Sequence, residues 1–102
     1  MQRIKDGVVT DDDLESLAIQ YKNWKPLARR LGFLEIESVK FIEDNEAVRE
    51  QAYAMLIAWK QREGYGATYR VLYAALCHPL VNRQDVAEEL CIDDERPFSV
   101  ST

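Results

Sequence analysis

The chain has 102 residues, of which 47% are hydrophobic and 30% are charged, a composition typical of one folded domain and not of a disordered segment. Its formal net charge of -5 argues against a dedicated nucleic-acid-binding protein, because contacts to phosphate need a surplus of lysine and arginine. No apolar run approaches the roughly 20 residues that a bilayer span requires, so we expect no membrane insertion.

Apolar residues recur at spacings of three and four, and no six-residue stretch alternates as a half-buried strand does. We therefore predict an all-α protein of six helices without strands. The chain divides into an N-terminal flanking segment (1–10), a folded domain (11–91) and a C-terminal tail (92–102). The first several residues and the tail are expected to fray.

The first helix is predicted to begin after Thr10, a good N-cap, with the aspartates of Asp11–Asp13 in its first turn. A second helix starts near Trp24, with Asn23 as its cap, and Gly32 ends it. A third, short helix follows, with an apolar stripe of Ile36, Val39 and Ile42.

The fourth helix is the longest, at residues 46–63, and Gly64 stops it. A fifth helix covers residues 68–77, Pro79 breaks the chain, and a sixth covers residues 83–91. The side chains that we expect in the core lie on the apolar stripes of these helices: Leu17, Trp24, Leu27, Leu31, Val39, Ile42, Met55, Leu56, Trp59, Leu72, Leu76, Val86 and Leu90.

The stretch REGYGATYR, residues 62–70, is similar to the start of a glycine-rich phosphate loop. Such a loop binds a dinucleotide only between a strand and a helix, because the strand end and the helix N-terminus together position the pyrophosphate. Here a predicted helix precedes Gly64, and the third glycine of the pattern is absent. We interpret the stretch as a turn between two helices and expect no cofactor.

Catalytic and metal-binding patterns are weak. His78 is the only histidine and sits beside Pro79, while Cys77 is adjacent to it and Cys91 lies on another helix, which matches no known zinc spacing. The carboxylates lie at predicted helix starts and on exposed faces, where capping and solvation explain them. We expect no enzyme, no catalytic residue and no metal site. The two cysteines indicate buried reduced thiols and a cytoplasmic location.

Charge is unevenly distributed along the chain. Lys22, Lys25 and Arg29 are spaced three and four apart and form what we call the basic ridge. A solvated surface explains any single charge, but one concentrated basic face on an acidic protein suits head-to-tail pairing of unlike surfaces. Acidic groups occur at residues 11–15, 35–37, 43–46 and 85–89. The candidate partner-binding residues are Lys22, Lys25, Arg29, Arg30, Glu35, Glu37, Tyr65, Asp85, Glu88 and Glu89.

Four segments in order, WKPLARRLGF, VREQAYAMLIAW, GATYRVLYAAL and NRQDVAEEL, together resemble the death domain over about residues 11–91. The resemblance implies a six-helix antiparallel bundle with Greek-key topology, without enzymatic activity or cofactor. It also implies a cytosolic module that binds other death domains, either different ones or copies of itself. Trp24 and Trp59 look like the core tryptophans of this family.

Two functions follow from the resemblance. The first is a homotypic interaction module in apoptotic or innate-immune signalling, and the segment IEDN is similar to adaptor death domains. The alternative is a largely monomeric regulatory domain of a cytoskeletal or receptor protein, since NRQDVAEEL is similar to the death domain of ankyrins. A DNA-binding helical domain is disfavoured by the net charge.

Overall fold

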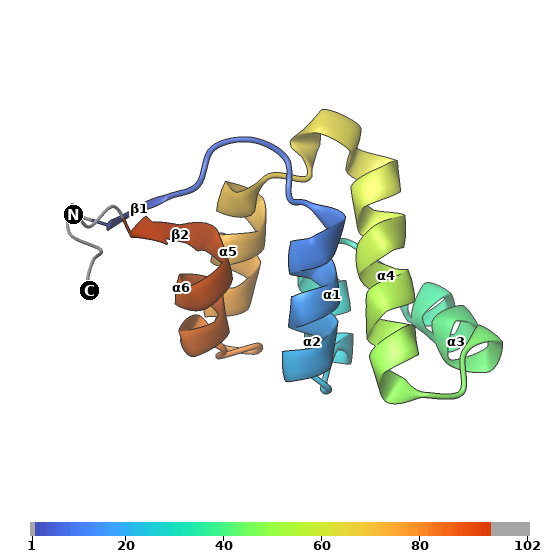
Figure 1. Ribbon diagram of the computed structural model, residues 1–102. Helices are drawn as coiled ribbons and strands as arrows, with labels where there is room; N and C mark the ends of the chain where they lie inside the picture. The colour runs from blue at the N-terminus through green and yellow to red at the C-terminus, as the bar shows by residue number, and fades with distance from the viewer. Residues whose placement is uncertain (1, 95–102) are drawn as a thin grey trace.

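Six α-helices and one short 3-10 helix make up most of the computed structural model, which describes residues 2–94 (Figure 1). The prediction of an all-α architecture with six helices is confirmed. The elements are β1 (Gln2–Ile4), α1 (Asp11–Gln20), α2 (Lys25–Arg30), α3 (Glu35–Asp44), α4 (Val48–Glu63), η1 (Gly64–Gly66), α5 (Tyr69–Cys77), α6 (Gln84–Cys91) and β2 (Ile92–Asp94).

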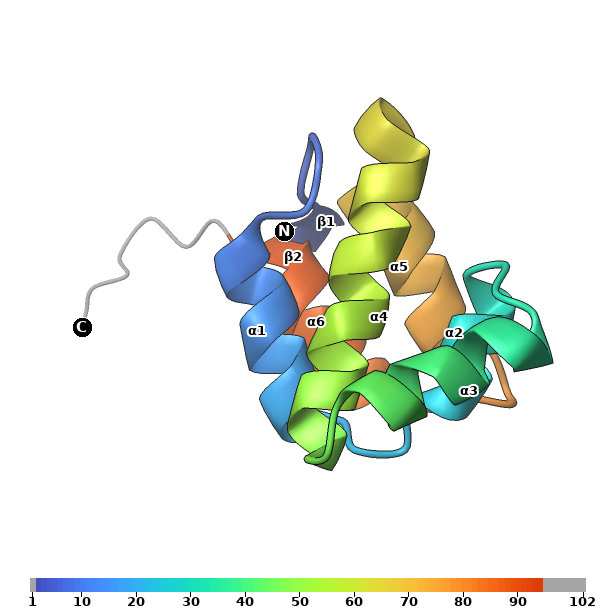
Figure 2. The same ribbon diagram turned by 90° about the vertical axis from the view of Figure 1, so that its right-hand side faces the viewer.

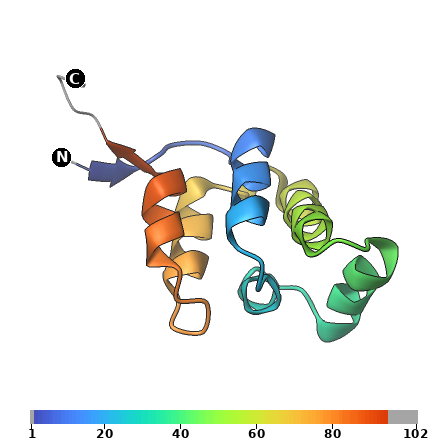
Figure 3. The ribbon, with the colours of Figure 1, turned by 60° about the horizontal axis from the view of Figure 1, so that its bottom comes forward.

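The helices pack as a bundle with α1 in the middle. Helix α1 packs against α4 on one side and α6 on the other, and α5 packs against α6 and α2. Helix α3 lies at the edge of this bundle and packs mainly against α4 and also against α2. Figure 3 shows α5 and α6 side by side at one end and α3 at the other. The sequence order of the helices therefore differs from their order in space.

Helix α1 begins as expected, because the Thr10 hydroxyl accepts a hydrogen bond from the Asp13 backbone N–H at 3.2 Å. The predicted cap of the second helix is wrong. Trp24, not Asn23, precedes α2, and no side chain caps this helix. A cap accepts from the second or third backbone N–H of a helix, and Pro26, the second residue of α2, has none.

Trp59, Met55 and Leu17 are almost completely buried, at 1%, 0% and 0% exposure. The other predicted core side chains that are buried are Trp24, Leu27, Leu31, Leu56, Leu72, Leu76, Val86 and Leu90, while Ile42 is half-buried against them. Val39 was predicted in the core but is 40% exposed. Helix α3 turns Ser38 and Phe41 inward instead, because it packs on one side only and this side is offset from the Ile36–Val39 stripe.

The prediction of no strand and frayed ends is wrong for part of both termini. Strand β1 pairs antiparallel with β2, with Ile4 opposite Ile92 and Gln2 opposite Asp94. Between β1 and α1 the chain runs over the start of α5, where the Val9 N–H donates to the Ala67 carbonyl at 2.9 Å. Residues 95–102 of the predicted tail lie outside the described residues. Pairing of two strands about ninety residues apart depends on the tertiary fold, and no local sequence pattern predicts it.

Gly64 is the C-cap of α4, with φ 57° and ψ −121°, a combination that residues with a Cβ adopt only under strain. We expect Gly64→Ala to lower the free energy of unfolding by about 1–3 kcal/mol. Gly66→Ala is the matched control, since Gly66 has no positive φ and a Cβ there would make only ordinary contacts, at 3.6 Å from Glu63. Equal melting temperatures of the two variants would contradict this account of the turn.

Candidate interaction surfaces

The basic ridge spans α2 and the loop before it. Lys25 and Arg29 lie one turn apart on α2, whereas Lys22 precedes the helix. Lys22 and Lys25 border a hollow of about 280 Å³ whose other walls include Ile42 and Val48. Neither lysine forms an ion pair with any residue from 2 to 94. The ridge therefore places two uncompensated cations beside a partly apolar hollow.

Arg29 differs from the two lysines. Its guanidinium lies 3.3 Å from the Glu35 carboxylate, with both side chains mostly exposed at 64% and 72%. An exposed pair of this kind contributes little to stability, but it places Glu35 next to the ridge and not on a separate face. Arg30, the last residue of α2, is also exposed.

Glu37 is used within the chain to hold the start of α3. Its carboxylate accepts a hydrogen bond from the Leu34 backbone N–H at 2.7 Å, and it lies 3.9 Å from Arg62. Arg62 also donates to the Leu31 carbonyl at 2.8 Å and covers the Phe33 ring at 4.2 Å. The sequence makes Glu35 and Glu37 candidate partner-binding residues, but in the structure both form contacts within the chain around α2 and α3.

The three predicted acids of α6 are exposed and each has a partner in the chain. Asp85 accepts two hydrogen bonds from Arg83, at 3.1 and 3.2 Å, and these bonds lower the pKa of its carboxyl. Glu88 accepts from Gln84 at 3.0 Å, and Glu89 accepts from Gln20 at 3.5 Å. The partners of the two glutamates are uncharged amides, so these contacts provide no opposite charge.

A second acidic site was missed from the sequence. Helices α1 and α4 lie side by side (Figure 2), and between them is a hollow of about 340 Å³ lined by Glu15, Glu50, Arg49 and Tyr53, among others. Glu15 and Glu50 are exposed and have no ion pair within the described part of the chain. In the sequence Glu15 and Glu50 are two unrelated acids, because no local pattern shows that α1 and α4 are neighbours.

Tyr65 projects from η1 at the corner between α4 and α5, with 95% of its surface exposed. It borders a hollow of about 530 Å³, together with Val8, Ile57 and Lys60. Large aromatic side chains at the rim of a hollow are typical anchors of protein interfaces. The structure therefore keeps Tyr65 as a candidate contact residue, on a different part of the surface from the basic ridge.

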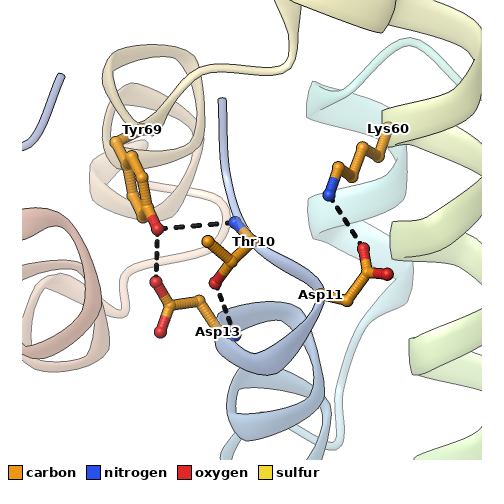
Figure 4. Close-up of polar contacts among 5 residues, drawn as sticks. All are labelled: Thr10, Asp11, Asp13, Lys60 and Tyr69. Atoms are coloured by element: carbon orange, nitrogen blue, oxygen red, sulfur yellow. Dashed lines mark hydrogen bonds and ion pairs between the residues drawn. The ribbon is translucent and has the colours of Figure 1, made fainter. Parts of the chain in front are cut away.

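Polar contacts tie the start of α1 to its neighbours (Figure 4). The Tyr69 hydroxyl donates to Asp13 and accepts from the Thr10 backbone N–H at 3.4 Å. Burial, and then the bond to Asp13, raise the pKa of Tyr69. Lys60 of α4 pairs with Asp11 at 2.8 Å. The acids of the first turn are thus partly compensated inside the molecule.

Residues 2–94 contain neither a metal-binding cluster nor a membrane-spanning helix. No group of three histidine, cysteine or acidic side chains there is placed to hold a metal ion. None of the helices in that range is both long and apolar enough to cross a bilayer. The stretch 62–70 consists of the end of α4, η1 and the start of α5, so a helix and not a strand precedes Gly64.

Comparison with protein families gives one match over most of the chain. A family model described as "Death domain" matches residues 11–91. The match includes all six helices and leaves out β1 and β2.

Two relatives show what the chain is similar to. It is 38% identical over 69 residues to the death domain-containing membrane protein NRADD of Rattus norvegicus, covering 68% of this chain and 28% of that protein. It is 40% identical over 58 residues to the receptor-interacting serine/threonine-protein kinase 1 of Homo sapiens, covering 54% of this chain and 9% of the kinase. The chain therefore spans less than a third of the length of either relative.

Proposed function

Because the chain belongs to the death-domain family, a family of protein–protein interaction modules, we propose that it assembles with other death domains through oppositely charged surfaces. The basic side of the contact is Lys22 and Lys25, with Arg29 next to them. The acidic side is the α1–α4 hollow with Glu15 and Glu50. We assign this assembly to apoptotic or innate-immune signalling in the cytoplasm.

The observation that carries this proposal is the pair of uncompensated lysines beside a partly apolar hollow. Arg29, Lys60 and Arg83 each lie next to an acid, whereas Arg30, Lys40, Arg49 and Arg70 form no ion pair within the described residues but do not border this hollow. Lys22 and Lys25 have no such acid within residues 2–94. An acidic partner surface would compensate both charges, and the apolar walls would add buried area.

The acidic side is assigned to the α1–α4 hollow because Glu15 and Glu50 both border it, lack partners in the described chain and outnumber Arg49, the basic residue of its lining. Glu88 and Glu89 of α6 are the second choice, because each already accepts a hydrogen bond within the chain. A contact between a basic surface on one copy and an acidic surface on the next is head-to-tail. It uses each surface once per subunit, so it can continue into a longer assembly.

The alternative function is a largely monomeric domain within a receptor or cytoskeletal protein. The observation that favours it is the similarity to a relative that is named a membrane protein and is more than twice as long as this chain. In that case the basic ridge would be only a solvated surface, and partners would bind elsewhere, for example at Tyr65.

Sedimentation velocity at different salt concentrations separates these functions. If charged surfaces drive assembly, the mean mass at a fixed protein concentration should fall as salt rises from about 0.1 M to about 1 M, since the Debye length shrinks from about 10 Å to about 3 Å. A mass that rises or stays constant above that of the monomer would contradict a charge-driven contact. A monomer at every protein and salt concentration would favour the alternative, with other death-domain chains as the next binding partners to test.

A further inference from the structure

The segment before α1, which the family match leaves out, is attached to the bundle by backbone hydrogen bonds and by the Lys5 side chain, which lies 3.9 Å from Asp13 and 5.3 Å from the centre of the Tyr69 ring. The β1–β2 pairing holds residues 2–4, and the Lys5 N–H donates to the Cys91 carbonyl at 2.7 Å. Further along, the Gly7 carbonyl accepts from the Tyr69 N–H at 3.3 Å, and Val8 forms a bridge with Thr68. We call residues 2–8 the strap.

No residue from 3 to 8 is fully buried. Arg3, Asp6 and Gly7 are exposed, and Ile4, Lys5 and Val8 are half-buried. Val9, the next residue, is different, because its side chain is 0% exposed and belongs to the core. Segments with few buried apolar contacts and exposed backbone hydrogen bonds open at a much lower free energy than the core. The structure thus changes abruptly from weak to strong attachment between Val8 and Val9.

The strap touches the same corner that carries Tyr65. Its partners Thr68 and Tyr69 lie two and three residues after the end of η1, and Val8 shares the hollow of about 530 Å³ with Tyr65. When the strap is seated, Val8 forms part of the wall of this hollow, and the strap backbone forms hydrogen bonds with the corner. When it is detached, the corner keeps only its attachment to α4, α5 and the Val9–Ala67 hydrogen bond.

We propose that the strap detaches as a unit while the helical bundle stays folded, that Val9 is the point at which detachment stops, and that the seated strap orders the Tyr65 corner. Any protein or force that acts on the chain before α1 would then control how the corner is presented. The inference that the strap detaches does not rest on the proposed function. Only its effect on partner binding does.

Amide hydrogen exchange of the whole chain in increasing urea tests the first part. The Lys5 and Tyr69 amides should exchange together, at least about tenfold faster than the Met55 amide in the middle of α4, which corresponds to about 1.4 kcal/mol. Their exchange should be nearly independent of urea, because little surface is exposed when the strap opens. The proposal would be overturned if the Lys5 and Tyr69 amides exchanged as slowly as the Met55 amide, or if they exchanged independently of each other. It would also be overturned if the Lys5 amide showed no protection.

The variant Val9→Ala tests the stopping point, with Val71→Ala, the same change at a 43% exposed position of α5, as control. Since Val9 stays buried when only the strap opens, Val9→Ala should leave exchange at Lys5 and Tyr69 unchanged. It should speed exchange of the residue 9 and Met55 amides, because these amides exchange only when residue 9 leaves the core or the bundle unfolds. If Val9→Ala speeds exchange of the Lys5 and Met55 amides by the same factor, detachment does not stop at Val9. If Val9→Ala does not fold, the urea series on the wild-type chain still decides whether the strap exists.

Discussion

Replacing Trp59 with alanine is expected to unfold much of the domain. The indole lies on α4 and is 1% exposed, in the helix that joins α1 on one side to α3 on the other. Removing a large aromatic side chain from a core costs about 3–5 kcal/mol. A domain of this size has a total stability of about 5–15 kcal/mol, so the loss is a large fraction of the whole.

Thermal melting followed by far-UV circular dichroism measures this effect, with Tyr65→Ala as the control. Tyr65 is also a large aromatic residue, but it is 95% exposed, so its removal should leave the melting temperature nearly unchanged. If Trp59→Ala keeps both its helical signal and its melting temperature, the packing described for α4 is wrong.

The second large effect is expected on assembly. Lys25→Glu would place a negative charge at the centre of the basic side, where it would face the acidic side of the next copy. Like charges opposed at an interface cost several kcal/mol, so assembly should be lost. The fold should remain, because Lys25 is exposed and has no ion pair with a residue of the described chain.

The control for this substitution is Arg70→Glu, which makes the same change of charge at an exposed position of α5. Sedimentation velocity should show a monomer for Lys25→Glu and wild-type assembly for Arg70→Glu. Equal loss in both variants would mean that only net charge matters. Lys25 is a sharper choice than Arg29 because Arg29 already contacts Glu35.

Features fixed by neighbouring residues could be predicted from the sequence. The Thr10 cap depends on a hydroxyl three positions before an N–H, and the end of α4 depends on one glycine with a positive φ. Trp59 continues the apolar spacing of α4, so its burial follows from the helix periodicity. Each of these signals lies within one or two turns of chain.

Features that depend on the packing of distant segments could not be predicted. The side of α3 that faces the bundle is set by α4 and α2, and this choice left Val39 exposed. The strand β1 has no alternating pattern and forms because β2 lies beside it. Glu15 and Glu50 share a hollow only because α1 packs on α4. The same limit explains why the sequence did not show that Glu35 lies against Arg29.

Mixing two charge-reversed variants tests the proposed contact most directly. Lys25→Glu retains an intact acidic side, and the double variant Glu15→Lys, Glu50→Lys retains an intact basic side, so each alone should be monomeric. Together they should form a dimer through the two wild-type surfaces and nothing longer, because each subunit has lost its other surface. A parallel mixture with Glu88→Lys, Glu89→Lys decides whether α6 supplies the acidic side instead. The account predicts a dimer in the first mixture; monomers in both mixtures, or wild-type assembly by Lys25→Glu alone, would contradict it.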